Sequence, residues 1–180
     1  MALPSLWTNP RGHLHFDRLR TEAALRSAAH RPPVSRAEWE ARAASLRTEL
    51  KKRLRVEPEN EPLEACFHGE PLQRHGYTVQ PVSYRAAKGV RVTGTLYRPD
   101  GPGPFPAVLN MHGHFTEGKL APRVQSRGHL LAQNGFVVLV VDTAGAGERG
   151  GDGEHFEYHG GFRAGGLILA GDSLLGWQVR

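Results

Sequence analysis

The sequence has little cysteine and no long apolar run, and both shortages exclude classes of protein. Cys66 is the one cysteine among 180 residues, which excludes an intrachain disulfide and a cysteine-rich zinc site. It lies in a proline-flanked stretch with no strand before it, so we expect a buried or incidental residue rather than a nucleophile. The first residues contain no charged segment followed by an apolar one, and no run approaches the roughly 18 apolar residues of a membrane span. We therefore expect neither a secretory signal nor a transmembrane segment, and a cytoplasmic location.

Negative charge is scarce in the first third of the chain. Residues 1–55 hold 12 Lys and Arg but 5 Asp and Glu, whereas the whole chain has a net charge of +5. Such a basic segment is one feature of nucleic-acid binding. Here the basic residues are interleaved with Glu and Ala, and the aromatic residues are not spaced as a stacking platform, which favours a solvated helix face. We expect partners among neither nucleic acids nor membranes.

Residues 1–70 are expected to form a helical N-terminal extension and linker. Ser35 and Glu38 have the spacing of a capping box and predict that a helix begins there. Apolar residues then recur on one face of that helix, namely Trp39, Ala43, Leu46, Leu50 and Leu54. We expect this stripe to pack on the main domain while the opposite, basic face stays in water. Pro58 and Pro62 should end the helix and begin a linker that runs to about residue 75.

Residues 71–180 carry an α/β pattern. Residues 76–98 predict a β-hairpin, in which Pro81 indicates an edge strand. Strands at 106–111 and 136–141 lack alternation, which is typical of strands covered on both faces. A helix over about 120–134, ending at a C-cap formed by Asn134 and Gly135, joins these two strands and predicts a right-handed parallel crossover.

The end of the chain is rich in glycine. Between residues 150 and 166 the glycines are too frequent for us to expect a helix, and from about 167 to 180 the sequence looks like the beginning of one. The predicted order is therefore helical extension, hairpin, and one parallel β-α-β unit.

The residues His112-Gly113-His114 follow the first buried strand and suggest a site. Acyl transfer needs backbone N–H groups already aimed at the developing oxyanion, and a glycine after the strand lets the chain turn to present one. We assign this donor to the amide of His114 and expect His112 and Gly113 to line the substrate pocket. The alternative is an ordinary strand-to-loop turn.

A second glycine-rich loop follows the second buried strand. Gly145-Ala-Gly147-Glu-Arg-Gly150 matches the letters of a dinucleotide fingerprint, and Asp172 lies roughly 20 residues on. That fingerprint requires a helix that starts inside it, and the glycine-rich residues that follow argue against one. We expect Glu148 and Arg149 to form an ion pair that shapes this loop, or to contact substrate, since loops at the carboxyl ends of parallel strands bind ligands.

Two further motifs have competing explanations. Gly171-Asp-Ser-Leu174 spells the block of the GDSL esterases, but six residues follow it, and an N-cap role for Asp172 or Ser173 is the better interpretation. A metal site could use His112, His114, His155 and His159 with Glu154 and Glu157. We expect loop residues and no metal, because the flanking glycines make a helical His-x-x-x-His pair doubtful.

Taken in order, several segments resemble one known family. They are His-Gly-His, Lys119, Leu-Ala-Gln-Asn-Gly-Phe-Val-Val-Leu-Val-Val-Asp, Gly-Ala-Gly-Glu-Arg-Gly, Glu-Tyr-His and Leu-Leu-Gly-Trp-Gln-Val. Together they resemble the acetyl xylan esterase-like, dienelactone hydrolase-related branch of the α/β-hydrolases, over roughly residues 75–180. The resemblance implies a serine hydrolase that acts on small-molecule or carbohydrate carboxylic esters with a Ser-His-Asp triad and no cofactor.

The resemblance also shows what the sequence lacks. No G-x-S-x-G motif occurs, and the histidines named above precede the place where this fold carries its nucleophile, so none is nominated as the base. We expect a partial α/β-hydrolase fold over residues 71–180, ending before the nucleophile elbow, and no esterase activity from these residues alone. A non-catalytic binding domain derived from a hydrolase, and a nucleotide-binding module that uses the Gly145–Gly150 loop, are the alternatives.

Overall fold

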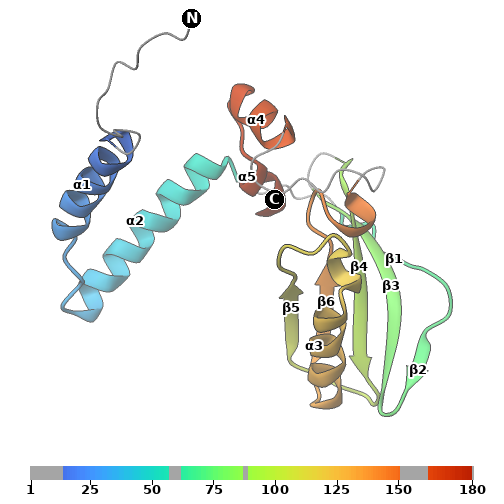
Figure 1. Ribbon diagram of the computed structural model, residues 1–180. Coiled ribbons are helices and arrows are strands. Elements are labelled where there is room, and N and C mark those ends of the chain that lie inside the picture. Colours follow the sequence, from blue (N-terminus) through green and yellow to red (C-terminus); the bar gives the residue numbers. More distant parts are fainter. Residues whose placement is uncertain (1–13, 57–61, 87–88, 151–161, 180) are drawn as a thin grey trace, which may run out of the picture. The chain divides into compact units, whose positions relative to one another are not determined.

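The computed structural model of the chain describes residues 14–56, 62–86, 89–150 and 162–179 (Figure 1). The chain divides into two units, Met1–Thr48 and Glu49–Arg180. Among the described residues, no helix combines the length and the apolar character needed to cross a membrane.

Two helices, α1 (Leu14–Ala28) and α2 (Arg36–Leu54), make up the described N-terminal region. The predicted cap of α2 is confirmed: Ser35 Oγ accepts a hydrogen bond from the Glu38 amide at 3.2 Å, and Glu38 Oε2 accepts one from the Val34 amide at 2.8 Å. In the apolar stripe of α2, Ala43 is buried, whereas the large side chains Trp39, Leu46 and Leu50 are exposed. That the stripe packs on the main domain stays a prediction.

The second unit is built on a mixed sheet with the strand order β1-β3-β4-β6-β5. The predicted hairpin is confirmed as β3 (Tyr77–Arg85) and β4 (Arg91–Pro99), which pair antiparallel along their whole length. Strands β5 (Ala107–Met111) and β6 (Val137–Val141) pair parallel, with Leu109 opposite Leu139. The expected parallel β-α-β unit is therefore present, and the fold class is α/β.

Helix α3 (Pro122–Gln133) joins the two parallel strands and ends as the sequence predicts. Gly135 has a φ of +84°, a conformation that suits glycine, and its amide donates to the Ala132 carbonyl at 3.1 Å. The Phe136 amide donates to the Leu131 carbonyl, also at 3.1 Å. This pair of hydrogen bonds is a Schellman motif, which directs the chain from the helix straight into β6.

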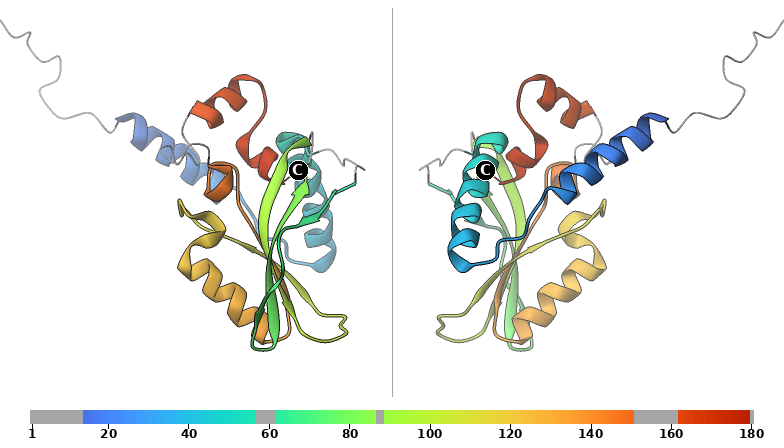
Figure 2. Two further views of the ribbon diagram at one scale, coloured as in Figure 1. Left: turned by 90° about the vertical axis from the view of Figure 1, so that its right-hand side faces the viewer. Right: turned by 90° about the vertical axis from the view of Figure 1, so that its left-hand side faces the viewer.

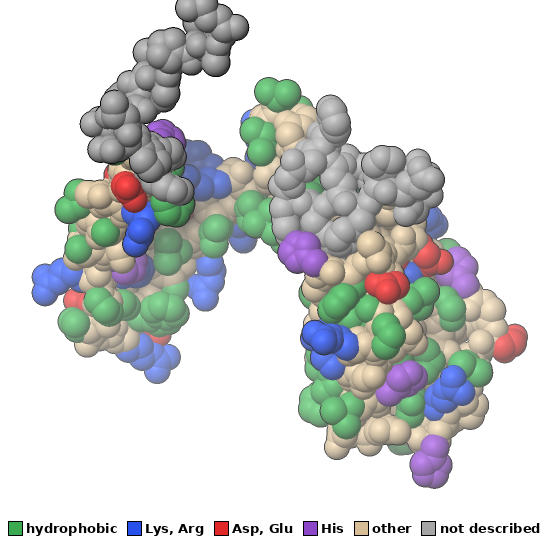
Figure 3. All heavy atoms as spheres, viewed as in Figure 1, with side chains coloured by type: hydrophobic (Ala, Val, Ile, Leu, Met, Phe, Trp, Pro, Cys, Tyr) green, Lys and Arg blue, Asp and Glu red, His purple; other side chains and the backbone are tan. Residues whose placement is uncertain are grey.

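Helix α3 lies against one face of the sheet (Figure 2), and the hydrophobic core lies between the two. Its buried members are Tyr77, Tyr97, Ala121, Val124, Ala132, Val138 and Val140. Gly128 lets the helix approach closely, because a Cβ at this position would lie 2.7 Å from the Tyr97 ring. On the outer side of α3, charged, histidine and hydrophobic side chains are interspersed, as on an ordinary solvated surface (Figure 3).

The expectation that both parallel strands are covered on both faces is wrong for the described residues. Leu109 and Met111 of β5 are exposed, because they point away from α3. The face opposite α3 is hollowed by a cavity of about 650 Å³ that is lined mainly by apolar residues, among them Phe67, Val82, Leu96, Leu109 and Leu139. One face of this sheet is thus packed and the other is open.

Two short strands in the expected linker were not predicted. Strands β1 (Cys66–Phe67) and β2 (Leu72–Arg74) both pair antiparallel with β3, so β3 is not the edge strand that Pro81 suggested. Pro81 is tolerated because it lies between the segments paired with β1 and β2, where its carbonyl accepts a hydrogen bond from the His68 amide at 2.9 Å. Cys66 is exposed.

The expectation that residues 150–166 form no helix is wrong for residues 162–166, and residues 151–161 lie outside the described part of the chain. Helix α4 (Phe162–Leu169) includes both Gly165 and Gly166, and α5 (Leu174–Val179) follows. Gly171, with a φ of +73°, ends α4 in a second Schellman motif, in which the Asp172 amide donates to Leu167 and the Gly171 amide to Ile168. The hydrogen bonds of this well-formed helix end counter the cost of about 1 kcal/mol that each internal glycine brings.

Candidate functional site

The predicted site residues gather on two loops at the carboxyl ends of β5 and β6. The first loop contains His112, Gly113 and His114 and leads into the 3₁₀ turn Gly118–Leu120. The second contains the 3₁₀ turn Gly147–Arg149. Because β5 and β6 are parallel neighbours, these loops emerge side by side, where α/β proteins bind their ligands.

A buried ion pair joins the two loops. The side chains of Lys119 and Asp142 are 4% and 0% exposed, and Lys119 Nζ contacts Asp142 Oδ2. The Lys119 amide donates to Asp142 Oδ1, and the Thr93 hydroxyl donates to Asp142 Oδ2, both at 2.8 Å. Both carboxylate oxygens are therefore bound, as a buried charge requires.

Two glycines make room for this carboxylate. Gly118 and Gly147 have φ values of +58° and +54°. A Cβ would lie 2.2 Å from Asp142 Oδ1 if added to Gly118, and 2.3 Å from it if added to Gly147. Gly147 thus serves to pack a loop against a carboxylate, and its segment forms a short 3₁₀ turn rather than the first turn of an α-helix. A pyrophosphate at this glycine would meet a negative charge, so the arrangement gives no support to the dinucleotide interpretation.

His112 is a buried side chain that ties the first loop to the second. Its Nε2 accepts a hydrogen bond from the Thr143 amide at 3.2 Å, and its Nδ1 lies 2.8 Å from the Gly113 carbonyl. Since an amide can only donate and a carbonyl can only accept, the ring is the neutral tautomer with its proton on Nδ1. His112 therefore holds the first loop against the second, and it is not among the residues that line the neighbouring cavity.

Gly113 and His114 form the exposed turn that follows. The Phe115 amide donates to the Gly113 carbonyl at 2.9 Å, which closes a tight bend around His114. The next residues are held by the Lys119–Asp142 pair and by the Gly147 amide, which donates to the Thr116 carbonyl at 2.9 Å. The backbone on which we expect the oxyanion donor is thus braced from the second loop.

We expected Glu148 and Arg149 to pair with each other, but each contacts a different partner. Glu148 is 62% exposed and its Oε2 contacts Lys119 Nζ. Arg149 is half-buried, and its Nη1 donates to the Asp142 carbonyl at 2.9 Å. Burial lowers the pKa of Arg149, an effect that Tyr84 and Asp142 partly offset. Burial likewise raises the pKa of Tyr84, against the opposing charge of Arg149.

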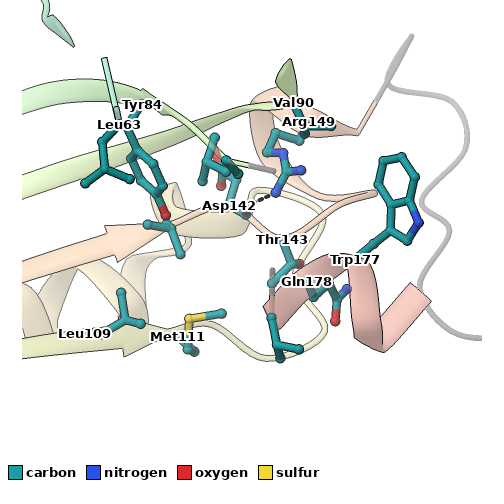
Figure 4. Close-up of a pocket in the computed structure, with 14 residues that line it drawn as sticks. Leu63, Tyr84, Val90, Leu109, Met111, Asp142, Thr143, Arg149, Trp177 and Gln178 are labelled. Atoms are coloured by element: carbon teal, nitrogen blue, oxygen red, sulfur yellow. Dashed lines mark hydrogen bonds between the residues drawn. The ribbon is translucent and has the colours of Figure 1, made fainter. Parts of the chain in front are cut away.

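A cavity of about 480 Å³ opens beside these loops (Figure 4). Its apolar wall comes from strands β4, β5 and β6 and from α5, and its polar members are Tyr84, Asp142, Thr143, Arg149 and Gln178. Of the site residues predicted from the sequence, Arg149 lines it. Tyr84, Thr143 and Trp177 were missed because residues far apart in sequence meet there only once the sheet has formed.

Helix α5 carries one wall of the cavity, and its cap confirms a prediction. Ser173 Oγ accepts a hydrogen bond from the Gly176 amide at 2.9 Å, the bond of an N-cap. Asp172 accepts hydrogen bonds from the Ser173 amide at 2.8 Å and from the Trp177 indole at 2.9 Å. The Gly-Asp-Ser-Leu block therefore starts a helix and orients Trp177 toward the cavity.

The suggested metal ligands fall partly outside the described residues. His155, His159, Glu154 and Glu157 lie in the segment 151–161, which the structure does not describe. Among the residues it does describe, no group of three or more His, Cys, Asp or Glu is arranged to hold a metal ion.

The chain is similar to one peptidase family model and to solved structures that are described as esterases. A family model described as X-Pro dipeptidyl-peptidase (S15 family) matches residues 88–160, and no curated protein matches the chain. A structure from Bacteroides fragilis, provisionally described as an acetyl xylan esterase, superposes with a TM-score of 0.66 at 19% identity, over 83% of this chain and 42% of its own. The methylesterase BT1017 superposes with a TM-score of 0.55 at 27% identity, over 75% of this chain and 30% of its own.

The hairpin, the parallel β-α-β unit and the paired loops define part of an α/β-hydrolase fold. The resemblance predicted from the sequence is confirmed at the level of the fold, which the chain shares with the structure described as an acetyl xylan esterase and with the methylesterase. The chain spans less than half the length of either structure.

Proposed function

We propose that this chain supplies the oxyanion loop and part of the pocket wall of a serine-type carboxylic-ester hydrolase, acting on a small-molecule or carbohydrate ester. The observation that carries the proposal is the braced turn at His112-Gly113-His114 at the end of a parallel strand. The hydrolase fold shared with the similar structures supports the reaction class.

Stabilisation of an oxyanion requires a backbone N–H group that is held rigidly. A backbone N–H stabilises a tetrahedral oxyanion best when its direction is fixed before the reaction, so that no reorganisation accompanies the charge. The His112 ring and the buried Lys119–Asp142 pair hold the turn from both sides. The amide of His114 is the donor that we assign to this task.

The nucleophile, the acid and the base of the triad are proposed to lie outside residues 1–180. No G-x-S-x-G motif occurs in the sequence, and the hydroxyl of Ser173 accepts the capping bond of α5. The residues described are thus proposed to stabilise an oxyanion that another part of the protein generates.

The test uses the uninterrupted reading frame of the gene that encodes residues 1–180. We expect a G-x-S-x-G motif within roughly 40 residues after Arg180 and hydrolysis of 4-nitrophenyl acetate that is lost when that serine becomes alanine. In this protein His114→Pro, which removes the amide hydrogen, should lower kcat by about a hundredfold to a thousandfold. His114→Ala keeps the amide and should lower kcat far less.

Two results would overturn the proposal. The first is a reading frame that yields no esterase activity with any simple ester. The second is an active protein in which His114→Pro and His114→Ala have equal effects, which would place the oxyanion donor elsewhere. Circular dichroism of both variants would show that the proline has not unfolded the protein.

A further inference from the structure

The cavity beside the two loops has a mainly apolar lining that also contains aromatic side chains. At about 480 Å³ it is large enough for a small organic ligand, and most of its lining is apolar. Tyr84 from β3 and Trp177 from α5 add two aromatic side chains (Figure 4). The Trp177 ring is fixed by the hydrogen bond from its indole N–H to Asp172. Such walls suit a flat, apolar ligand body.

Arg149 brings a positive charge into this apolar lining. Its guanidinium is half-buried and donates to the Asp142 main-chain carbonyl. Within the part of the chain that the structure describes, no carboxylate forms an ion pair with it. Among the described residues, Asp142 also lines the cavity, but its carboxylate is 0% exposed and contacts Lys119, which contacts the Glu148 carboxylate as well.

This distribution of charge indicates what the cavity can recognise. A guanidinium presents five N–H donors in a rigid planar fork, and a single carbonyl uses only a small part of them. A carboxylate is the group that matches the fork best, and removal from water strengthens the pairing. Arg149 is therefore equipped to bind an anion inside the cavity.

We propose that the cavity binds a carboxylate with an apolar, aromatic body, with Arg149 pairing with the carboxylate and Tyr84 and Trp177 flanking the body. Only one part of this proposal rests on the proposed function: if the protein is an ester hydrolase, its substrates would be esters that also carry a free carboxylate. The binding of the carboxylate itself does not depend on catalysis.

The test measures binding to the 180-residue chain. The probes are 4-methylbenzoate and its neutral isostere 4-methylbenzamide, followed by calorimetry and by ligand-observed NMR. We expect the carboxylate to bind about tenfold more tightly than the amide, and Arg149→Gln to abolish that preference. Arg149→Lys should retain part of it, because it keeps the charge but loses the fork. Arg98→Gln removes an exposed arginine from β4 and should leave it unchanged.

Equal affinity for the two probes, or no binding of either, would overturn the proposal, and so would an undiminished preference in Arg149→Gln. The wild-type comparison of acid and amide stands even if the Arg149 variants are unstable. The outcome also separates the two proposals. If the longer reading frame gives an active esterase that shows no preference for the carboxylate, only the binding-site proposal is refuted. If it gives no esterase activity while the preference for the carboxylate remains, only the hydrolase proposal is refuted.

Discussion

At the scale of the residue, the Lys119–Asp142 pair has a large energetic consequence, because both of its charges are buried. Each charge is buried almost completely, and without Lys119 the Asp142 carboxylate would lose its cation, whereas Lys119 would keep its contact with Glu148. The pair lies between the loop that leaves β5 and the loop that leaves β6, so it fixes the position of both loops. Its contribution is best judged by removing one partner.

We expect Lys119→Met to lower the free energy of unfolding by about 3–5 kcal/mol, because it leaves the Asp142 carboxylate buried without its cation. The matched control is Glu49→Gln, which breaks the exposed pair between Arg53 and Glu49, at 2.7 Å in α2. An exposed pair of this kind contributes only about 0.3–0.5 kcal/mol. Urea denaturation followed by circular dichroism measures both; equal losses in the two variants would contradict the argument.

At the scale of the element, the docking of α3 on the sheet has a polar component. The Tyr77 hydroxyl lies 2.7 Å from His129 Nδ1, and the His129 and Tyr97 rings form a T-shaped pair with their centroids 5.1 Å apart. Burial lowers the pKa of His129, and the charge of Arg74 lowers it further. The neutral ring is therefore the form that accepts the phenolic hydrogen bond.

This contact predicts a pH dependence. An unfolded histidine titrates near pH 6.5, and His129 in the folded state titrates lower. Between these values the unfolded state binds more protons, so the contribution of His129 is complete above about pH 6.5 and is lost as the pH falls. Tyr77→Phe removes the hydrogen-bond donor and should cost about 1 kcal/mol at pH 7.5.

The measurement is the difference in unfolding free energy between wild type and Tyr77→Phe at several pH values. Because both proteins share every other titrating group, this difference isolates the contact. It should shrink between pH 7 and pH 5, where a protonated ring no longer accepts the bond. A difference that stays constant or grows on acidification would show that the hydroxyl does not donate to His129.

Elements of this kind also show where sequence reasoning succeeded. Local signals sufficed for the ends of α2 and α3, because Ser35, Glu38 and Gly135 act on backbone groups within a few residues of themselves. Strands β1 and β2 were missed because two or three residues carry no periodicity, and their pairing with β3 is all that defines them. The cavity was missed for the same reason, since Tyr84, Thr143 and Trp177 share no sequence pattern.

At the scale of the whole unit Glu49–Arg180, the sheet has two unlike faces. Helix α3 covers one, and the other exposes apolar side chains beside a shallow cavity of about 650 Å³. Strand β5 lies at the end of the strand order, so its outer edge pairs with no other described strand. An open apolar face next to an unpaired edge favours association between copies.

We therefore predict that the purified 180-residue chain self-associates in the micromolar range, and that Leu109→Lys shifts it toward the 19.8 kDa monomer in sedimentation velocity. Leu109 lies on the open face and is 61% exposed; Leu130, on the outer side of α3, is 60% exposed. Leu130→Lys adds the same charge at equal exposure but should leave the association unchanged. If the two substitutions act alike, the effect is one of net charge and not of the open face. A wild-type chain that stays monomeric and melts cooperatively would instead favour the non-catalytic binding domain, because such a domain must be stable and soluble with this face uncovered.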